Sequence, residues 1–143
     1  MIDTGREGVS GWVTISQERI DAFAEATDDR QWIHVDVERA RRDSPYGATV
    51  AHGFLTLSLI SSLLRDAVHI DGVGMGVNYG LNRVRFPAPV VAGSRVRGHF
   101  RALAVEESDD GVKVTWSVTV EREGGTKPCC VGEWITMYYE VSG

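Results

Sequence analysis

A change of hydrophobic period near residue 70 constrains the fold more than any other feature of this chain. Residues 53–67 are apolar around most of a helical circumference, with only a narrow stripe of serines, which predicts one long helix buried nearly all round. After this segment the apolar residues recur with period two, as they do in β-strands. A buried helix followed by strands requires a sheet that covers the helix.

The strand-like segments are rich in Val, Tyr, Trp, Thr and Ile, and turn-forming Pro, Asp and Gly residues separate them. They comprise residues 73–86, 94–107, 111–122 and 130–141. Four consecutive strands after helices predict an α+β fold with a largely antiparallel sheet covering one long helix. The chain contains no repeat, low-complexity stretch or linker, so we treat residues 1–143 as one domain.

The N-terminal part is expected to add one strand and two helices. Residues 11–16 resemble a short opening strand, and Ser16 is a suitable N-cap for a helix that ends near Thr27. Residues 36–43 predict a second, short polar helix that Ser44 and Pro45 end.

Composition excludes several classes of function. The net charge of −5 argues against a nucleic-acid partner, and no segment approaches the roughly 18 apolar residues of a membrane span. We therefore expect a cytoplasmic protein without a membrane or nucleic-acid partner. The adjacent Cys129 and Cys130 would point to opposite faces of a strand, so we expect reduced thiols and no metal site.

Reactive side chains are densest between the first predicted helix and the long one, where Asp29 and His34 are the candidate acid/base pair. On a helix these residues would lie about 140° apart, so they converge only if the segment is a loop. A carboxylate and an imidazole that meet on one water can act as general acid and base. The alternative is an ordinary surface loop that happens to contain an Asp and a His.

A second candidate region, His52-Gly53, opens the long helix. The first N–H groups of a helix lack partners within the helix, and glycine lets a ligand approach them closely. Gly53 could therefore stabilise the oxygen of a thioester as negative charge develops on it. The alternative is a glycine needed only for tight packing, and we assign His52 a structural role.

Three motifs together resemble the MaoC-like hydratases and dehydratases of the hot-dog fold. They are Asp29-Arg-Gln-Trp-Ile-His34, Ala51-His-Gly-Phe-Leu55 and Arg85-Phe-Pro-Ala-Pro-Val90. The resemblance spans roughly residues 10–140 and implies a curled antiparallel sheet wrapped around one central helix. Gln31-Trp32 departs from the Asn-Pro that is common in the hydratase motif, as in the branch grouped with nodulation protein N.

The resemblance implies an (R)-specific enoyl-CoA hydratase or 3-hydroxyacyl-thioester dehydratase. Asp29 and His34 would hold and activate the water, Gly53 would bind the thioester oxygen, and Ser61 would line the site. The substrate would be an acyl-CoA or acyl-carrier thioester, with no metal or other cofactor. The family also implies a homodimer, which the free edge of a single sheet favours.

Further arginines fall into two groups. Arg83 and Arg85 are candidates for contacting CoA phosphates because they follow the long helix. Arg95, Arg97, His99 and Arg101 alternate along one strand, which predicts a solvated face. Two other functions stay open: a thioesterase of the same fold, and a non-catalytic subunit that binds acyl thioesters.

Overall fold

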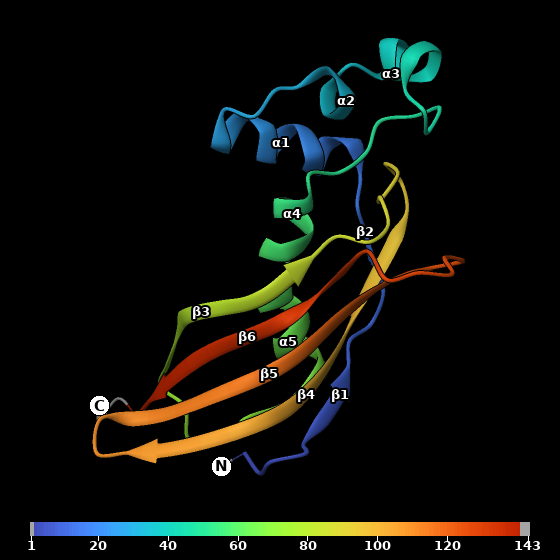
Figure 1. Cartoon of the computed structure of the whole chain (residues 1–143). Coiled ribbons are helices and arrows are strands. Elements are labelled where there is room, and N and C mark those ends of the chain that lie inside the picture. Colours follow the sequence, from blue (N-terminus) through green and yellow to red (C-terminus); the bar gives the residue numbers. More distant parts are fainter. Residues whose placement is uncertain (1, 141–143) are drawn as a thin grey trace.

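Within residues 2–140, which the computed structural model describes, six strands form one antiparallel sheet in the order β1-β4-β5-β6-β3, and β2 also pairs with β4 (Figure 1). The strands are β1 (Glu7–Val9), β2 (Val13–Thr14), β3 (Met75–Arg85), β4 (Arg95–Ser108), β5 (Gly111–Arg122) and β6 (Cys130–Tyr139). These bounds confirm the four predicted strands of the C-terminal half. Residue 141, the last of the segment predicted at 130–141, lies outside the described residues.

The predicted long helix forms along nearly its full length but consists of two segments, α4 (Gly53–Ser58) and α5 (Ile60–Ala67). Between them the Ser58 hydroxyl donates to the Phe54 carbonyl at 2.7 Å, a back-bond that commonly bends helices. The N–H of Leu59 is shared between the carbonyls of Leu55 and Thr56, at 3.1 and 3.2 Å. The prediction of one uninterrupted helix was wrong at this turn.

The core lies between α5 and one face of the sheet, which curves around the helix without closing. Every second residue of β5 is buried, as expected when one strand face meets the core. The buried members include Val114, Trp116 and Val120 of β5, and Ile60, Leu63 and Leu64 of α5. The predicted α+β arrangement of a curled antiparallel sheet on a central helix is confirmed.

The prediction of burial all round is wrong for both segments. In α5, Ser62, Arg65 and Asp66 are exposed, and the buried residues lie on one face of the helix. Phe54 is 66% exposed, because α4 lies at the end of the sheet, between the sheet and the N-terminal helices (Figure 1). Phe54 is therefore an apolar residue of the segment 53–67 that stays exposed to solvent.

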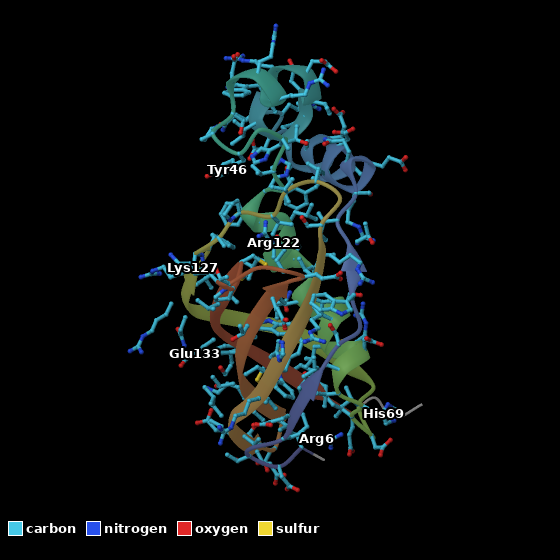
Figure 2. The ribbon with its side chains drawn as sticks, turned by 90° about the vertical axis from the view of Figure 1, so that its right-hand side faces the viewer. Arg6, Tyr46, His69, Arg122, Lys127 and Glu133 are labelled. Carbon is cyan, nitrogen blue, oxygen red and sulfur yellow. The ribbon has the colours of Figure 1, made fainter. Side chains whose placement is uncertain are left out.

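The N-terminal helices form a separate layer beyond the end of the sheet (Figure 1, and in side view Figure 2). They are α1 (Gln17–Thr27), α2 (Trp32–Val35) and α3 (Val37–Asp43). Ser16 caps α1 as predicted, accepting from the Arg19 N–H at 3.1 Å, and Ser44 follows the end of α3. We call residues 16–52, which connect β2 to α4, the overhang.

The opening strand differs from its prediction at residues 11–16. Within the predicted segment only β2 (Val13–Thr14) is a strand, and β1 precedes it. Between the two, the Gly11 N–H donates to the Asp66 carboxylate at 2.6 Å. On both sides of this break the chain pairs with β4.

Candidate active site

The overhang brings Asp29 and His34 together. Asp29 lies in the loop after α1, which ends at Asp28 in the left-handed conformation with φ 60°. His34 lies in the single helical turn α2, so the expected loop holds for Asp29 but not for His34. Side-chain atoms of Asp29, His34 and His52 all lie within 4.8 Å of one another, a spacing that one water could bridge by hydrogen bonds. The catalytic roles of Asp29 and His34 stay a prediction.

His34 is held in one orientation and one tautomer. Its side chain is buried, and Nδ1 lies 2.6 Å from the carbonyl oxygen of Val50. A carbonyl only accepts, so Nδ1–H donates a hydrogen bond to it, and in the neutral ring Nε2 carries the lone pair. An imidazole in this state can accept a proton from a water at Nε2.

Two polar residues that the sequence analysis did not single out form hydrogen bonds that hold α2 in place. The Gln17 side-chain amide donates to the His34 carbonyl at 2.7 Å and accepts from the Thr49 hydroxyl at 2.5 Å. Nothing in the local sequence marks Gln17 or Thr49, because their partners lie far along the chain. They tie α1, α2 and the segment before α4 into one unit.

The Asp29 carboxylate is exposed, and no hydrogen bond or ion pair among residues 2–140 involves it. By contrast, the neighbouring Arg30 pairs with Glu25 at 2.6 Å and with Asp28 at 2.8 Å. The Arg30 guanidinium hydrogen bond lowers the pKa of Glu25 below its ordinary value. The carboxylate of Asp29 is thus the one in this loop left available for a ligand.

Gly53 is the first residue of α4, and His52 is its N-cap in an extended conformation. Its N–H is one of the donors that a helix cannot satisfy, and no acceptor for it occurs in the part of the chain described. A Cβ at Gly53 would lie 3.0 Å from the Phe86 ring, so packing also favours glycine here. The role as oxygen-binding donor stays a prediction.

Asp29, His34 and His52 contain the donor types of a metal site, but their geometry does not suit one. The two imidazole rings are stacked, with centroids 3.8 Å apart and planes 22° apart. A metal bound by both rings must lie close to both ring planes, and nearly parallel stacked planes do not meet near the ring nitrogens. The stacked rings therefore do not suit a shared ion.

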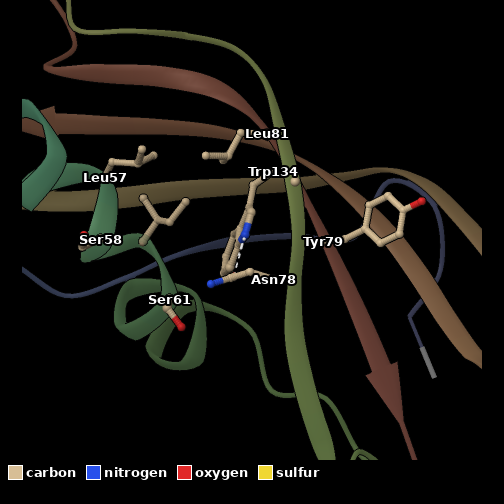
Figure 3. Close-up of a pocket in the computed structure, with 9 residues that line it drawn as sticks. Leu57, Ser58, Ser61, Asn78, Tyr79, Leu81 and Trp134 are labelled. Atoms are coloured by element: carbon tan, nitrogen blue, oxygen red, sulfur yellow. Dashed lines mark hydrogen bonds between the residues drawn. The ribbon is translucent and has the colours of Figure 1, made fainter.

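Ser61 lies further along the helix and lines a pocket between α4–α5 and the strands β3 and β6 (Figure 3). The pocket has a volume of about 290 Å³ and is lined by Leu57, Ser58, Ile60, Ser61, Asn78, Tyr79, Gly80, Leu81 and Trp134. Across it, the Trp134 indole N–H donates to the Asn78 side-chain oxygen at 3.1 Å. Asp29, His34 and Gly53 are not among its lining residues, so the part that Ser61 plays stays a prediction.

Arg83 and Arg85 lie at an irregularity of β3, where the pairing register with β6 shifts between Asn82 and Arg85. Arg83 has φ 53°, which is uncommon for a residue with a side chain, and both arginines are exposed. The strand continues into Phe86, whose ring packs on Gly53. Arg85 is therefore adjacent in sequence to a residue that contacts the start of α4. Phosphate binding by Arg83 and Arg85 stays a prediction.

The other predicted features lie away from this site. Arg95, Arg97, His99 and Arg101 are half-exposed or exposed on the outer sheet face, where acidic side chains pair with them, so the predicted solvated face is confirmed. Cys129 and Cys130 are buried, unbridged thiols, and burial raises the pKa of each to about 11. No helix within residues 2–140 is long and apolar enough to cross a membrane.

A curled sheet on a helix, with an overhang that presents a carboxylate and an imidazole, defines a class of hot-dog proteins. The chain belongs to this class as a member of the MaoC-like domain family, whose model matches residues 4–123.

The most informative relatives have names that refer to thioester chemistry or to nodulation. A 3-hydroxyacyl-thioester dehydratase Z of Mycobacterium tuberculosis is 53% identical over 132 residues, covering 92% of this chain and 87% of the relative. Nodulation protein N of Rhizobium leguminosarum is 48% identical, covering 91% and 82%. Among solved structures, the (R)-hydratase PhaJ1 of Pseudomonas aeruginosa shares the fold, with a TM-score of 0.79, 24% identity and coverage of 98% and 84%.

Proposed function

We propose that this protein is a hydro-lyase that adds water reversibly to a trans-2-enoyl thioester and forms a (3R)-hydroxyacyl thioester. The observation that carries this proposal is the convergence of Asp29 and His34 within 4.8 Å in the overhang that leads directly to the free N–H of Gly53. The 53% identity to a 3-hydroxyacyl-thioester dehydratase supports it.

In the proposed hydration, the thioester oxygen accepts a hydrogen bond from the Gly53 N–H, and one water lies between the Asp29 carboxylate and Nε2 of His34. The water oxygen bonds to C3, the C2–C3 π electrons move toward the thioester carbonyl, and the Gly53 N–H stabilises the resulting enolate oxygen. The pair removes one proton from the water and one proton reaches C2, so H and OH add across the double bond. We leave open which residue is base and which is acid, since the two are coupled.

The groove beside α5 supports an acyl chain as the remainder of the substrate. The pocket of about 290 Å³ shares Ser61, Asn78 and Trp134 with a neighbouring pocket of about 430 Å³ that continues toward Ile70 and Tyr138. Leucine, isoleucine, valine and aromatic side chains supply just over half of the residues of each lining, which suits an alkyl chain. Arg83 and Arg85 would contact the phosphates of CoA or of a carrier arm.

We further propose that the chain forms a homodimer through β3. Among residues 2–140 this strand pairs only with β6, and its 11 residues leave a long free edge, whereas β1 at the other end of the sheet has 3 residues. Met75, Val77, Tyr79 and Leu81 of β3 are each at least 43% exposed, and unpaired apolar edges invite strand pairing with another chain.

The proposed reaction needs no metal or redox cofactor, because the acid/base pair and the backbone N–H together supply the proton transfers and the charge stabilisation. We also propose a cytoplasmic location, which suits two buried thiols that form no disulfide.

The test is an assay with enoyl-CoA esters of graded chain length. A hydratase lowers the enoyl absorbance without releasing thiol, whereas a thioesterase releases free CoA. A non-catalytic subunit binds the thioester and does neither. Loss of enoyl absorbance with at least one chain length, and the (3R) product, are expected. Thiol release as the main reaction, or binding without turnover across the series, would overturn the proposal.

A further inference from the structure

His52 lies at the centre of the candidate site, although the proposed reaction assigns it no proton to transfer. Its side chain is only 2% exposed, and its ring stacks on His34 with a centroid distance of 3.8 Å. The Phe23 ring packs on it as well, with a centroid distance of 4.9 Å. Buried polar rings in such surroundings require a hydrogen-bonded partner.

That partner is the backbone carbonyl of Asp29, 2.9 Å from Nε2 of His52. Because a carbonyl only accepts, Nε2 must carry the ring proton, and Nδ1 then has a lone pair. Nδ1 is buried and has no hydrogen-bond partner among residues 2–140. The single donor of this ring is therefore used to hold the loop that carries Asp29.

The other restraints on this loop are exposed to solvent. Arg30 pairs with Glu25 and Asp28, but the three side chains are 48–83% exposed, and such pairs contribute little. Asp28, the C-cap of α1, has a φ of 60°, a left-handed conformation that Asp adopts more readily than most residues with a side chain. Among the side-chain hydrogen bonds of residues 2–140, the one from His52 reaches this loop from inside the protein.

The backbone of His52 connects the same ring to the third part of the site. As the N-cap residue of α4, His52 accepts from the N–H groups of Leu55 and Thr56 at 3.0 and 3.3 Å, and the next residue is Gly53. A displacement of the ring therefore changes the position of the Asp29 carbonyl relative to the Gly53 N–H.

From these contacts we infer that His52 is a positioning residue, which places Asp29 relative to His34 and the Gly53 N–H through the hydrogen bond from Nε2 to the Asp29 carbonyl. The inference rests on the proposed function, since it assigns His52 a role in the same reaction. A misplacement of about 1 Å can lower a rate by about 10²-fold even when the displaced group is intact.

The test compares two substitutions that differ in one donor. In His52→Gln the amide N–H can take the place of Nε2–H, whereas His52→Met fills similar space without a donor. For His52→Met we expect kcat to fall by about 10²-fold with KM changed by less than about threefold. The Gln variant should recover most of that loss.

A double-mutant cycle with Asp29→Asn separates positioning from a general loss of structure. If His52 acts through Asp29, the Met substitution costs little further activity once Asp29 is already Asn. Fully multiplicative losses, equal losses in the Gln and Met variants, or an unimpaired Met variant would each overturn the inference.

If the Met variant fails to fold, its melting temperature and circular dichroism will show this, and the Gln variant then provides the test. The Gln variant must retain activity well above that of Asp29→Asn. Activity of the unmodified protein tests the proposed function separately, so failure of one proposal does not mimic failure of the other.

Discussion

Two clusters in this molecule contain the same types of side chain, histidine and carboxylate, but their hydrogen-bond partners differ. On the outer sheet face, the Glu121 carboxylate accepts from Arg97 at 3.0 Å and lies 2.6 Å from Nε2 of His99. In the overhang, His34 and His52 each bond a backbone carbonyl instead, and the Asp29 carboxylate bonds to no other group in the described range 2–140.

Solvent exposure is reversed as well. In the outer cluster the three side chains are each 33–40% exposed, and Arg97 and His99 both contact the Glu121 carboxylate. In the overhang the imidazoles are buried and the carboxylate is exposed. Groups that are already paired have little left to offer a ligand, whereas fixed but unpaired groups can act on one. The difference favours the overhang over the more heavily charged sheet face as the candidate chemical site.

The strongest test of this comparison is to remove one group from each cluster. Asp29→Asn and His34→Ala should each lower kcat by about 10²-fold or more, as expected for a lost acid or base, with the fold intact. His99→Ala, the matched change on the outer face, should leave kcat within about twofold, because His99 does not belong to the acid/base pair. Near-normal turnover of crotonyl-CoA by either overhang variant would refute the assignment.

The next effect concerns the Gly53 N–H. Gly53 is the first residue of α4, a position where proline is well tolerated and where the preceding His52 is already extended. Gly53→Pro removes the donor, whereas Gly53→Ala adds a Cβ against Phe86 and keeps the donor. We expect kcat of the Pro variant to fall about 10²-fold below that of the Ala variant. Equal kcat values would show that the glycine serves packing alone.

Assembly provides a test that concerns two edges of the sheet. Light scattering should give at least twice 15.7 kDa for the unmodified protein at micromolar concentration. A lysine in place of Val77 on β3 should shift the mass toward the monomer, because it places a charge in the proposed interface. Val9→Lys on β1, where Val9 is 50% exposed, is the control and should leave the dimer intact. A monomeric Val9→Lys variant together with a dimeric Val77→Lys variant would show that the interface is formed by β1.

The smallest expected effect is on stability at low pH. The hydrogen bond from Arg97, and then that from His99, holds the pKa of the Glu121 carboxyl below its ordinary value of 4.5. Its contribution to the free energy of unfolding is present above pH 4.5 and is lost as the pH falls through the lowered folded pKa. Chemical denaturation at pH 7 and pH 3 should show a modest loss in Glu121→Gln that shrinks on acidification. A loss that persists unchanged at pH 3 would contradict this origin, and kcat should not change.

Local patterns in the sequence were sufficient for much of the fold. The apolar run at 53–67 and the period-two segments after it predicted the helix and four strands, because periodicity reports burial within a single element. Ser16 also marked the start of α1, because an N-cap side chain bonds to a backbone N–H only three residues further along the chain. The break after Ser58 was not predicted, because the hydroxyl's hydrogen bond to the helix leaves no trace in the apolar pattern.

By itself the sequence determined the fold class, and the spacing of Asp29 and His34 within a recognisable motif identified the candidate pair. Only the tertiary structure decided how that pair is held. The carbonyl that orients His34 comes from 16 residues away, and the carbonyl that His52 binds comes from 23 residues away. Hydrogen bonds between such distant residues depend on how the overhang packs on the start of α4, and local spacing contains no information about that packing.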